Sequence, residues 1–185
     1  MISQTPKPKK CKECKQVFVP KRNLQSVCGP LCAIAHSNKL KVKKDRKEYR
    51  EAKEKIKSRG DWLREAQIAI NAYRRESTKH LGCISCGTFN GKANGGHYRS
   101  VGSSPETRFV EENIWCQCER CNTHLSGNLI NYRIALVQRI GLDRVEWLEG
   151  PHDPKKYSVD ELKYIKSLYK QKLKELINNT GEINV

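Results

Sequence analysis

The residues of this chain best suited to chemistry lie between Cys83 and Asn128. Two Cys-x-x-Cys pairs stand in this stretch, with a lone histidine, His97, between them. Four thiolates with such spacing can bind one zinc ion tetrahedrally and hold together loops that cannot pack alone. His97 and the neighbouring asparagines are not needed for that zinc, so they are available for another task. The paired cysteines are Cys83, Cys86, Cys118 and Cys121.

Phosphodiester hydrolysis is one such task. It needs a base that activates water, a cation that holds the phosphate, and groups that fix both. A neutral histidine such as His97 suits the role of base, and the amide of Asn113 can orient its imidazole. The amide oxygen of Asn122 can bind magnesium, which prefers oxygen ligands. These three residues in this order fit a metal-assisted nuclease.

Each of these residues also has a simpler structural explanation. His97 could be a zinc ligand or a hydrogen-bonded loop histidine, although four cysteines make a fifth ligand redundant. Asn113 could hold a turn, and Asn122 could cap a helix, which asparagine does well. The ninth cysteine, Cys116, is best explained as buried packing.

The elements that must position these residues form a small α+β domain, expected over residues 81–150. Two short strands joined by a loop and followed by a helix are predicted. His97 falls on the first strand, Asn113 on the second and Asn122 in the first helical turn. That helix is expected to begin at the second cysteine pair and to continue through Leu136.

A second zinc module is expected in residues 1–38, where 13 residues separate two further cysteine pairs. Val17–Pro20 is predicted as a short strand and Gly29–Ala33 as the entry into a helix. A structural staple is the simplest role for this module. Its zinc ligands would be Cys11, Cys14, Cys28 and Cys32.

Positive charge is concentrated in the first third of the chain. The 185 residues carry a net charge of +16, and residues 1–60 hold 18 Lys/Arg against 5 Asp/Glu. Residues 39–59, with 11 basic and 4 acidic residues, predict a long exposed helix. A solvated face is the plain alternative, but so concentrated a charge favours branched or duplex DNA as partner. The side chains expected to contact phosphate are Lys41, Lys43, Lys44, Lys47, Arg99 and Arg108.

Two amphipathic helices complete the expected architecture. One covers Asp61–Arg75, with Asp61 as its cap, and completes a linker and grip segment over residues 39–80. The other, Ser158–Asn178, starts with a capping box and dominates residues 151–185. Either could pack on the central domain or against a second subunit, because symmetric cutting of a junction would need a homodimer.

The expected environment of the chain is the cytoplasm. Only 37% of the residues are hydrophobic, and neither a leader nor a run of membrane-spanning length is apparent, so no membrane partner is expected. In that reducing environment eight of the nine cysteines predict two structural zinc sites rather than disulfides.

Together the motifs resemble the His-Asn-His nuclease superfamily, or ββα-metal fold, in a four-cysteine, treble-clef form. The asparagine after the last cysteine makes the pattern similar to phage endonuclease VII. Over nearly the whole chain the sequence resembles the NinG (Rap) recombination proteins of lambdoid phages. The stretches that carry this likeness are Gly96–Ser100, Thr107–Phe109, Asn113–Ile114, Cys121–Asn122 and Ser126–Asn128.

The resemblance implies a phage-encoded endonuclease that uses Mg²⁺ or Mn²⁺ to cut Holliday junctions and D-loops in the bacterial host. His97 would be the general base, Asn113 would orient it, and Asn122 would bind the metal. Many superfamily members carry Asp or His just before the base as a metal ligand, where this chain has Gly96. Another ligand must then serve. The candidates are Asn94, Glu111, Glu112, His124 and Asn128, with Asn128 preferred.

Two other functions are compatible with the same residues. A non-catalytic, zinc-containing DNA-binding recombination adaptor would explain Gly96 by decay of the nuclease site. An RNA-binding zinc protein would use the same phosphate contacts, since these do not identify the sugar.

Overall fold

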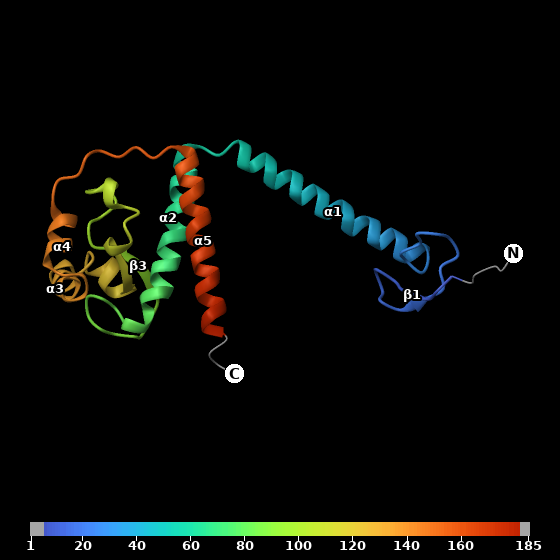
Figure 1. Cartoon of the computed structure of the whole chain (residues 1–185), viewed down its shortest axis with the longest axis horizontal. Coiled ribbons are helices and arrows are strands. Elements are labelled where there is room, and N and C mark those ends of the chain that lie inside the picture. Colours follow the sequence, from blue (N-terminus) through green and yellow to red (C-terminus); the bar gives the residue numbers. More distant parts are fainter. Residues whose placement is uncertain (1–5, 182–185) are drawn as a thin grey trace. The chain divides into compact units, whose positions relative to one another are not determined.

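A computed structural model describes residues 6–181 (Figure 1). The chain divides into two compact units, which meet in sequence between Lys57 and Ser58. Among the described helices, none is both long and apolar enough to cross a bilayer. The structure is therefore a mixed helix and sheet protein, with one cysteine cluster in each unit.

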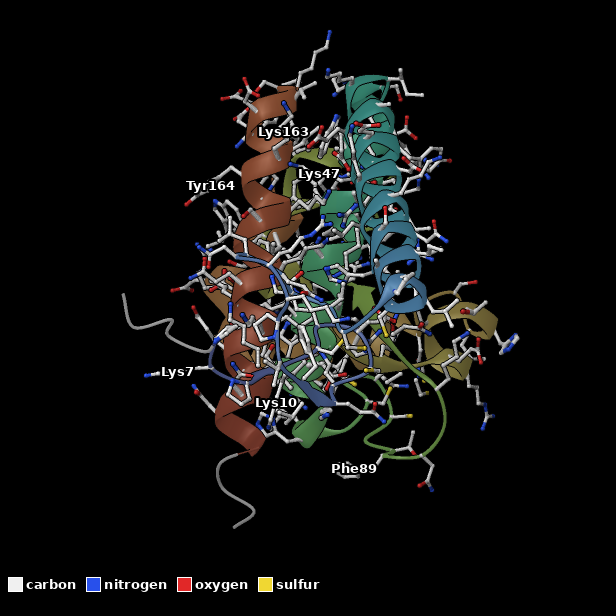
Figure 2. The ribbon with its side chains drawn as sticks, turned by 90° about the vertical axis from the view of Figure 1, so that its right-hand side faces the viewer. Lys7, Lys10, Lys47, Phe89, Lys163 and Tyr164 are labelled. Atoms are coloured by element: carbon white, nitrogen blue, oxygen red, sulfur yellow. The ribbon has the colours of Figure 1, made fainter. Side chains whose placement is uncertain are left out.

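The first unit consists of a small hairpin and one long helix. Strands β1 (Lys9–Lys10) and β2 (Val17–Phe18) pair in antiparallel fashion, and helix α1 follows at Pro30–Lys55. Gly29, in extended conformation, is the N-cap of α1, and Pro30 follows in the first turn. Proline is tolerated there because the first N–H groups of a helix have no intrahelical acceptor. None of the residues of α1 is buried, which confirms the expected exposed helix; Figure 2 shows Lys47 among its charged side chains.

Helix α1 begins nine residues earlier than the charge pattern predicted. Its first turns carry Cys32, so the helix is continuous with the first cysteine cluster rather than a linker that follows it. The helix entry predicted at Gly29–Ala33 is confirmed, but it was not joined to the charged helix, because the charged run begins only at Lys39.

The second unit is built on two long helices, α2 (Arg59–Thr78) and α5 (Val159–Gly181). The prediction that Asp61 caps α2 was wrong: Ser58 is the cap and Asp61 is the third helical residue. The Ser58 hydroxyl accepts from the Asp61 N–H at 3.2 Å, and the Asp61 carboxylate accepts from the Ser58 N–H at 3.0 Å. This capping box satisfies two N–H groups at the start of the helix.

The apolar stripes of α2 and α5 cover each other within one chain. The two helices run side by side in the same direction (Figure 1). Trp62 and Ala66 pack with Leu162, and Ile70 packs with Tyr169. These stripes are therefore not available to build a dimer. A homodimer stays a prediction that would need another surface.

A strand hairpin packs on the other face of α2. Strands β3 (Ala93–His97) and β4 (Ile114–Cys118) are antiparallel, with Gly96 opposite Trp115 and His97 opposite Ile114. Two 3-10 turns, η2 (Pro105–Thr107) and η3 (Glu111–Asn113), lie in the loop between them, and a third, η1 (Lys79–Leu81), follows α2. Asn113 is thus in a turn just before β4, and its predicted place on the strand was wrong.

The helical region after β4 is broken where one helix was predicted. A short π-helical segment, η4 (Arg120–His124), is followed by α3 (Leu129–Ile140) and by α4 (Leu142–Glu149), which was not predicted. Ser126, Gly127 and Asn128 all have positive φ, and such left-handed backbone ends a right-handed helix. The break places α3 and α4 over the hairpin. The core there contains Ile84, Tyr98, Trp115, Tyr132, Leu136, Val145 and Leu148.

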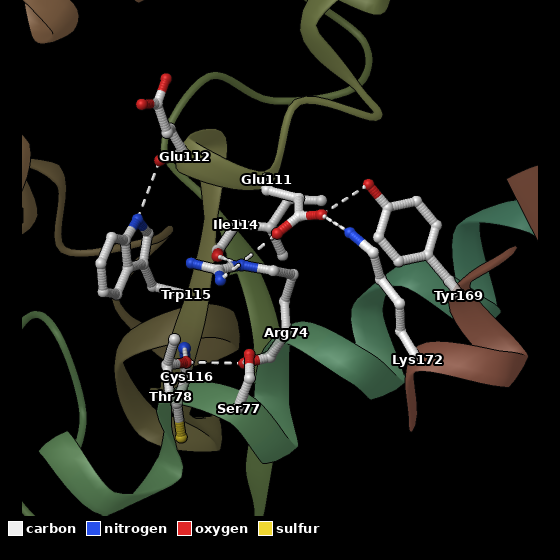
Figure 3. Close-up of polar contacts among 10 residues, drawn as sticks. All are labelled: Arg74, Ser77, Thr78, Glu111, Glu112, Ile114, Trp115, Cys116, Tyr169 and Lys172. Atoms are coloured by element: carbon white, nitrogen blue, oxygen red, sulfur yellow. Dashed lines mark hydrogen bonds and ion pairs between the residues drawn. The ribbon is translucent and has the colours of Figure 1, made fainter. Parts of the chain in front are cut away.

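A polar cluster joins α2, η3 and α5 beside the hairpin (Figure 3). Arg74 donates to the Ile114 carbonyl at 2.9 Å and lies 3.8 Å from the Glu111 carboxylate. Glu111 also accepts from Tyr169 at 3.0 Å and from Lys172 at 2.6 Å. The Glu111 carboxylate is therefore occupied by contacts that hold α2, η3 and α5 together.

Candidate functional site

The sulfur atoms of the two cysteine clusters have the spacing of metal sites. In each cluster all four Sγ atoms lie within 4.8 Å of one another. Cys28 and Cys32 are 3.5 Å apart at sulfur, and Cys86 and Cys118 are 3.8 Å apart. Zinc–sulfur bonds of about 2.3 Å give a tetrahedron whose sulfur–sulfur edge is about 3.8 Å. Each tetrad can thus hold a zinc-like ion.

The thiol electrostatics fit the same interpretation. Burial opposes ionisation of Cys11, yet the backbone N–H groups of Cys14, Cys28 and Glu13 lower its pKa to about 6. Hydrogen bonding to Cys28, with burial, raises the pKa of Cys32 to about 12. The Cys11 thiolate therefore forms readily, whereas ionisation of Cys32 in the same cluster is opposed. A divalent cation would remove that opposition.

Cys116 stands apart from the second cluster, as predicted. It is 5% exposed and lies on β4 between Trp115 and Gln117. Its backbone N–H donates to the Thr78 hydroxyl at 2.8 Å, a contact drawn in Figure 3. It is a buried packing residue.

His97 ends β3 and is half-buried. Burial lowers the pKa of its imidazole, and the charge of Arg108 acts in the same direction, although a hydrogen bond with the Arg108 backbone opposes both. The imidazole is therefore neutral at neutral pH. Its Nε2 lies 3.3 Å from the Arg108 carbonyl and 3.1 Å from the Gln67 side-chain nitrogen.

The side chain of Gln67, on α2, has one fixed orientation. Its Oε1 accepts from Arg108 Nε at 3.1 Å, and its Nε2 donates to Asn71 at 2.8 Å. The side of the imidazole that carries Nε2 is thus enclosed by Gln67 and by the loop that carries Arg108.

Asn113 is fully buried and acts on the loop rather than on the imidazole. Its Oδ1 accepts from the Arg99 N–H at 2.7 Å, and its Nδ2 donates to the Arg99 carbonyl at 3.0 Å and the Thr107 carbonyl at 3.2 Å. In the described chain its amide makes these contacts and none with His97. Asn113 therefore ties together the loop whose Arg108 carbonyl faces His97.

His97 and Asn122 line the same open depression, of about 400 Å³. Asn122 lies in η4 and is half-buried. A Cβ atom built on Gly96 would lie 3.0 Å from Asn122 Oδ1, so this oxygen faces the β3 backbone. The structure brings together the predicted base and the predicted metal-binding amide. Further residues around the depression are Arg99, Ser100, Ser126 and Leu129.

The candidates for a second metal ligand have other partners. Asn128 is the N-cap of α3, where its Nδ2 donates to Cys121 Sγ at 3.5 Å and its Oδ1 accepts from Asn131 at 3.0 Å. Glu111 holds Lys172 and Tyr169, and Glu112 pairs with Arg144. For the other two candidates, exposed His124 and half-buried Asn94 opposite Gln117 on the hairpin, the described part of the chain shows no side-chain hydrogen bond or ion pair.

The predicted phosphate contacts fall in both units. Lys41, Lys43, Lys44 and Lys47 are all exposed on α1. Arg99 borders the depression and donates to Ser104 at 3.2 Å. Arg108 is half-buried beside Gln67, so its guanidinium also has a structural role.

The sequence analysis missed two residues beside the site: Gln67, which contacts His97, and Gln117, whose side chain lies against Gly96. Gln67 lies 30 residues before His97, and no local spacing links the two. Gln117 gave a weak signal, as a polar residue in the middle of a buried strand.

Comparisons with known proteins place the chain among bacteriophage proteins. The family model described as Bacteriophage Lambda NinG protein matches residues 3–179. Protein ninG of Escherichia phage 933W is 39% identical over 96% of this chain and 98% of its own length. The proteins of the same name from Escherichia phage lambda (38%, 96% and 97%) and Salmonella phage P22 (37%, 94% and 96%) are similar throughout. No solved structure matches.

Proposed function

The chain belongs to the NinG family of bacteriophage proteins, and we propose that it is a metal-dependent endonuclease that cleaves branched DNA. One observation carries this proposal. His97, held neutral by burial, and the amide of Asn122 line the same depression. A base and an oxygen donor for a cation are the two groups that phosphodiester hydrolysis needs in one place.

In this proposal His97 removes a proton from the attacking water. His97 Nε2 faces both the Gln67 amide nitrogen, a donor at 3.1 Å, and the Arg108 carbonyl, an acceptor at 3.3 Å. In the tautomer whose Nε2–H donates to the Arg108 carbonyl, Nδ1 is left as the proton acceptor. The water oxygen then bonds to phosphorus, the bond from phosphorus to the leaving sugar oxygen breaks, and solvent protonates that oxygen. Asn113 keeps the Arg108 carbonyl in place through the loop.

The oxygen of Asn122 would bind Mg²⁺ or Mn²⁺. The bound ion would supply positive charge to the scissile phosphate and to the leaving oxygen. An amide oxygen suits such a hard cation, whereas the thiolates of the clusters suit zinc. The two kinds of metal would thus be kept apart by donor chemistry.

Helix α1 is proposed to bind the DNA backbone. Reversing its four lysines, Lys41, Lys43, Lys44 and Lys47, to glutamate should weaken DNA binding and flatten its dependence on salt. For every phosphate that the variant no longer neutralises, the slope of log K against log salt should become shallower by about 0.9 on duplex DNA. Binding measured by fluorescence anisotropy across a salt series tests this.

The matched control reverses four exposed lysines of the second unit: Lys155, Lys156, Lys170 and Lys174. It changes the net charge equally and should leave the salt slope nearer to that of the wild type. Equal slopes for both variants would mean that α1 is a solvated spacer.

A panel of labelled substrates tests the function itself. Zinc-loaded protein is incubated with a four-way junction, a D-loop, duplex DNA and RNA, each with Mg²⁺ or with EDTA added briefly after loading. We expect Mg²⁺-dependent nicking of the junction and D-loop, absent from the His97→Ala protein prepared in parallel. Tight binding without cleavage under either Mg²⁺ or Mn²⁺ would instead identify a DNA-binding adaptor, and preference for RNA would identify an RNA-binding protein.

A further inference from the structure

Gln117 occupies the middle of β4, and its side chain is fully buried. Its Nε2 donates to the Ser85 hydroxyl at 2.7 Å and to the Gly127 carbonyl at 2.5 Å. A carbonyl only accepts hydrogen bonds, so the nitrogen of the amide must face Gly127. The orientation of the amide is therefore fixed, and Oε1 points the other way.

That Oε1 is a buried acceptor with no hydrogen-bond partner among the described residues. Buried polar side-chain atoms nearly always have a partner, and an ion or a water molecule is a recognised explanation when protein offers none. Gln117 Nε2 makes two hydrogen bonds, so loose packing of the amide does not explain why Oε1 lacks a partner.

The position of Gly96 shows where the oxygen points. A Cβ on Gly96 would collide with Gln117 Oε1, would lie 2.9 Å from Gln117 Cβ, and would lie 3.0 Å from Asn122 Oδ1. The two amide oxygens thus converge on one point beside the β3 backbone. Tyr132 fixes that backbone by donating to the Gly96 carbonyl at 3.0 Å.

We propose that Gln117 Oε1 and Asn122 Oδ1 together bind the divalent cation of the site. Gln117 fills the space that a ligand side chain at position 96 would need. Both donors are amide oxygens, which belong to the hard oxygen ligands that Mg²⁺ and Mn²⁺ accept, and the rest of the coordination shell would be water and phosphate oxygen. This inference rests on the proposed function, since it names the ligands of the same site.

Binding of Mn²⁺ to the zinc-loaded full chain, followed by the electron paramagnetic resonance signal of free Mn²⁺, tests the proposal without DNA or cleavage. Gln117→Met keeps the length of the side chain but removes the oxygen. It should weaken Mn²⁺ binding by at least about tenfold, as should Asn122→Ala, because removing even a group that supports a metal ligand indirectly has an effect of that size. Ser85→Ala is the matched control. It removes one Nε2 partner, leaves Oε1 untouched, and should bind Mn²⁺ as the wild type does.

The outcomes separate the two proposals. If Asn122→Ala loses Mn²⁺ but Gln117→Met does not, the Gln117 ligand is wrong and its oxygen meets only water, while the nuclease proposal stands. If the wild type neither binds Mn²⁺ nor cleaves DNA, the nuclease proposal itself fails. Should Gln117→Met not fold, Gln117→Glu decides, because a carboxylate oxygen at this place should tighten Mn²⁺ binding. Unchanged or weaker binding by Gln117→Glu would overturn the inference.

Discussion

Replacing Cys121 with serine is expected to release one zinc ion and to unfold the region around the hairpin. Cys121 is 1% exposed and lies within 4.8 Å of the other three sulfur atoms of its cluster. Its cluster joins the segment before β3 to the end of β4 and to η4, and its buried cysteines form a group separate from the larger apolar clusters. Loss of a structural metal is one of the changes that can lower the free energy of unfolding by about 4–5 kcal/mol or more. Urea unfolding followed by tryptophan fluorescence measures the free energy, and metal analysis counts the zinc.

The matched control is Cys116→Ser, which changes a buried cysteine outside the cluster. A hydroxyl buried there should cost only about 1–3 kcal/mol, and both zinc ions should remain. If Cys121→Ser also retains two zinc ions and unfolds like Cys116→Ser, the second tetrad is not a zinc site.

The second large effect is expected for His97→Ala. If His97 is the base, the single-turnover rate of junction cleavage should fall by about 100- to 10,000-fold. The dissociation constant for the junction should change little, because the lysines of α1 and not the imidazole would provide the grip. His80→Ala is the matched control, since this exposed histidine lies in η1 and does not line the depression. Equal rates for His97→Ala and wild type would exclude the base.

The pH dependence of cleavage provides an independent check on His97. Burial lowers the pKa of the imidazole from its ordinary value of 6.5, so the neutral form persists to lower pH than in a free histidine. Cleavage should therefore be independent of pH above 6.5 and should fall only as the pH drops below that value. A pH–rate profile at saturating Mg²⁺ measures this. An acid limb centred above the ordinary pKa of histidine would contradict the assignment.

Local patterns predicted the parts of the fold that depend on neighbouring residues. The two cysteine tetrads follow from the Cys-x-x-Cys pairs and the Cys28–Cys32 pair, because a few intervening residues already bring two sulfur atoms within reach of one metal ion. The exposed helix α1 and the capping box of α5 follow from charge and from Ser158 with Glu161. Left-handed backbone at Ser126 was not predictable in this way, since serine seldom adopts it, whereas asparagine, as at Asn128, adopts it more often.

The sequence by itself therefore determined the family, the two cysteine tetrads that could hold a metal ion, and His97 and Asn122 as candidates for the chemistry. Tertiary structure decided which residues support them. Asn113 hydrogen-bonds to the loop, and α2 covers α5. Gln117 Oε1, which has no partner among the described residues, lies beside Gly96 near Asn122 Oδ1. The physical reason is distance along the chain: Ser85, Gly96, Gln117 and Gly127 meet only after the hairpin and η4 have packed. No short-range spacing records a contact that exists only between folded segments.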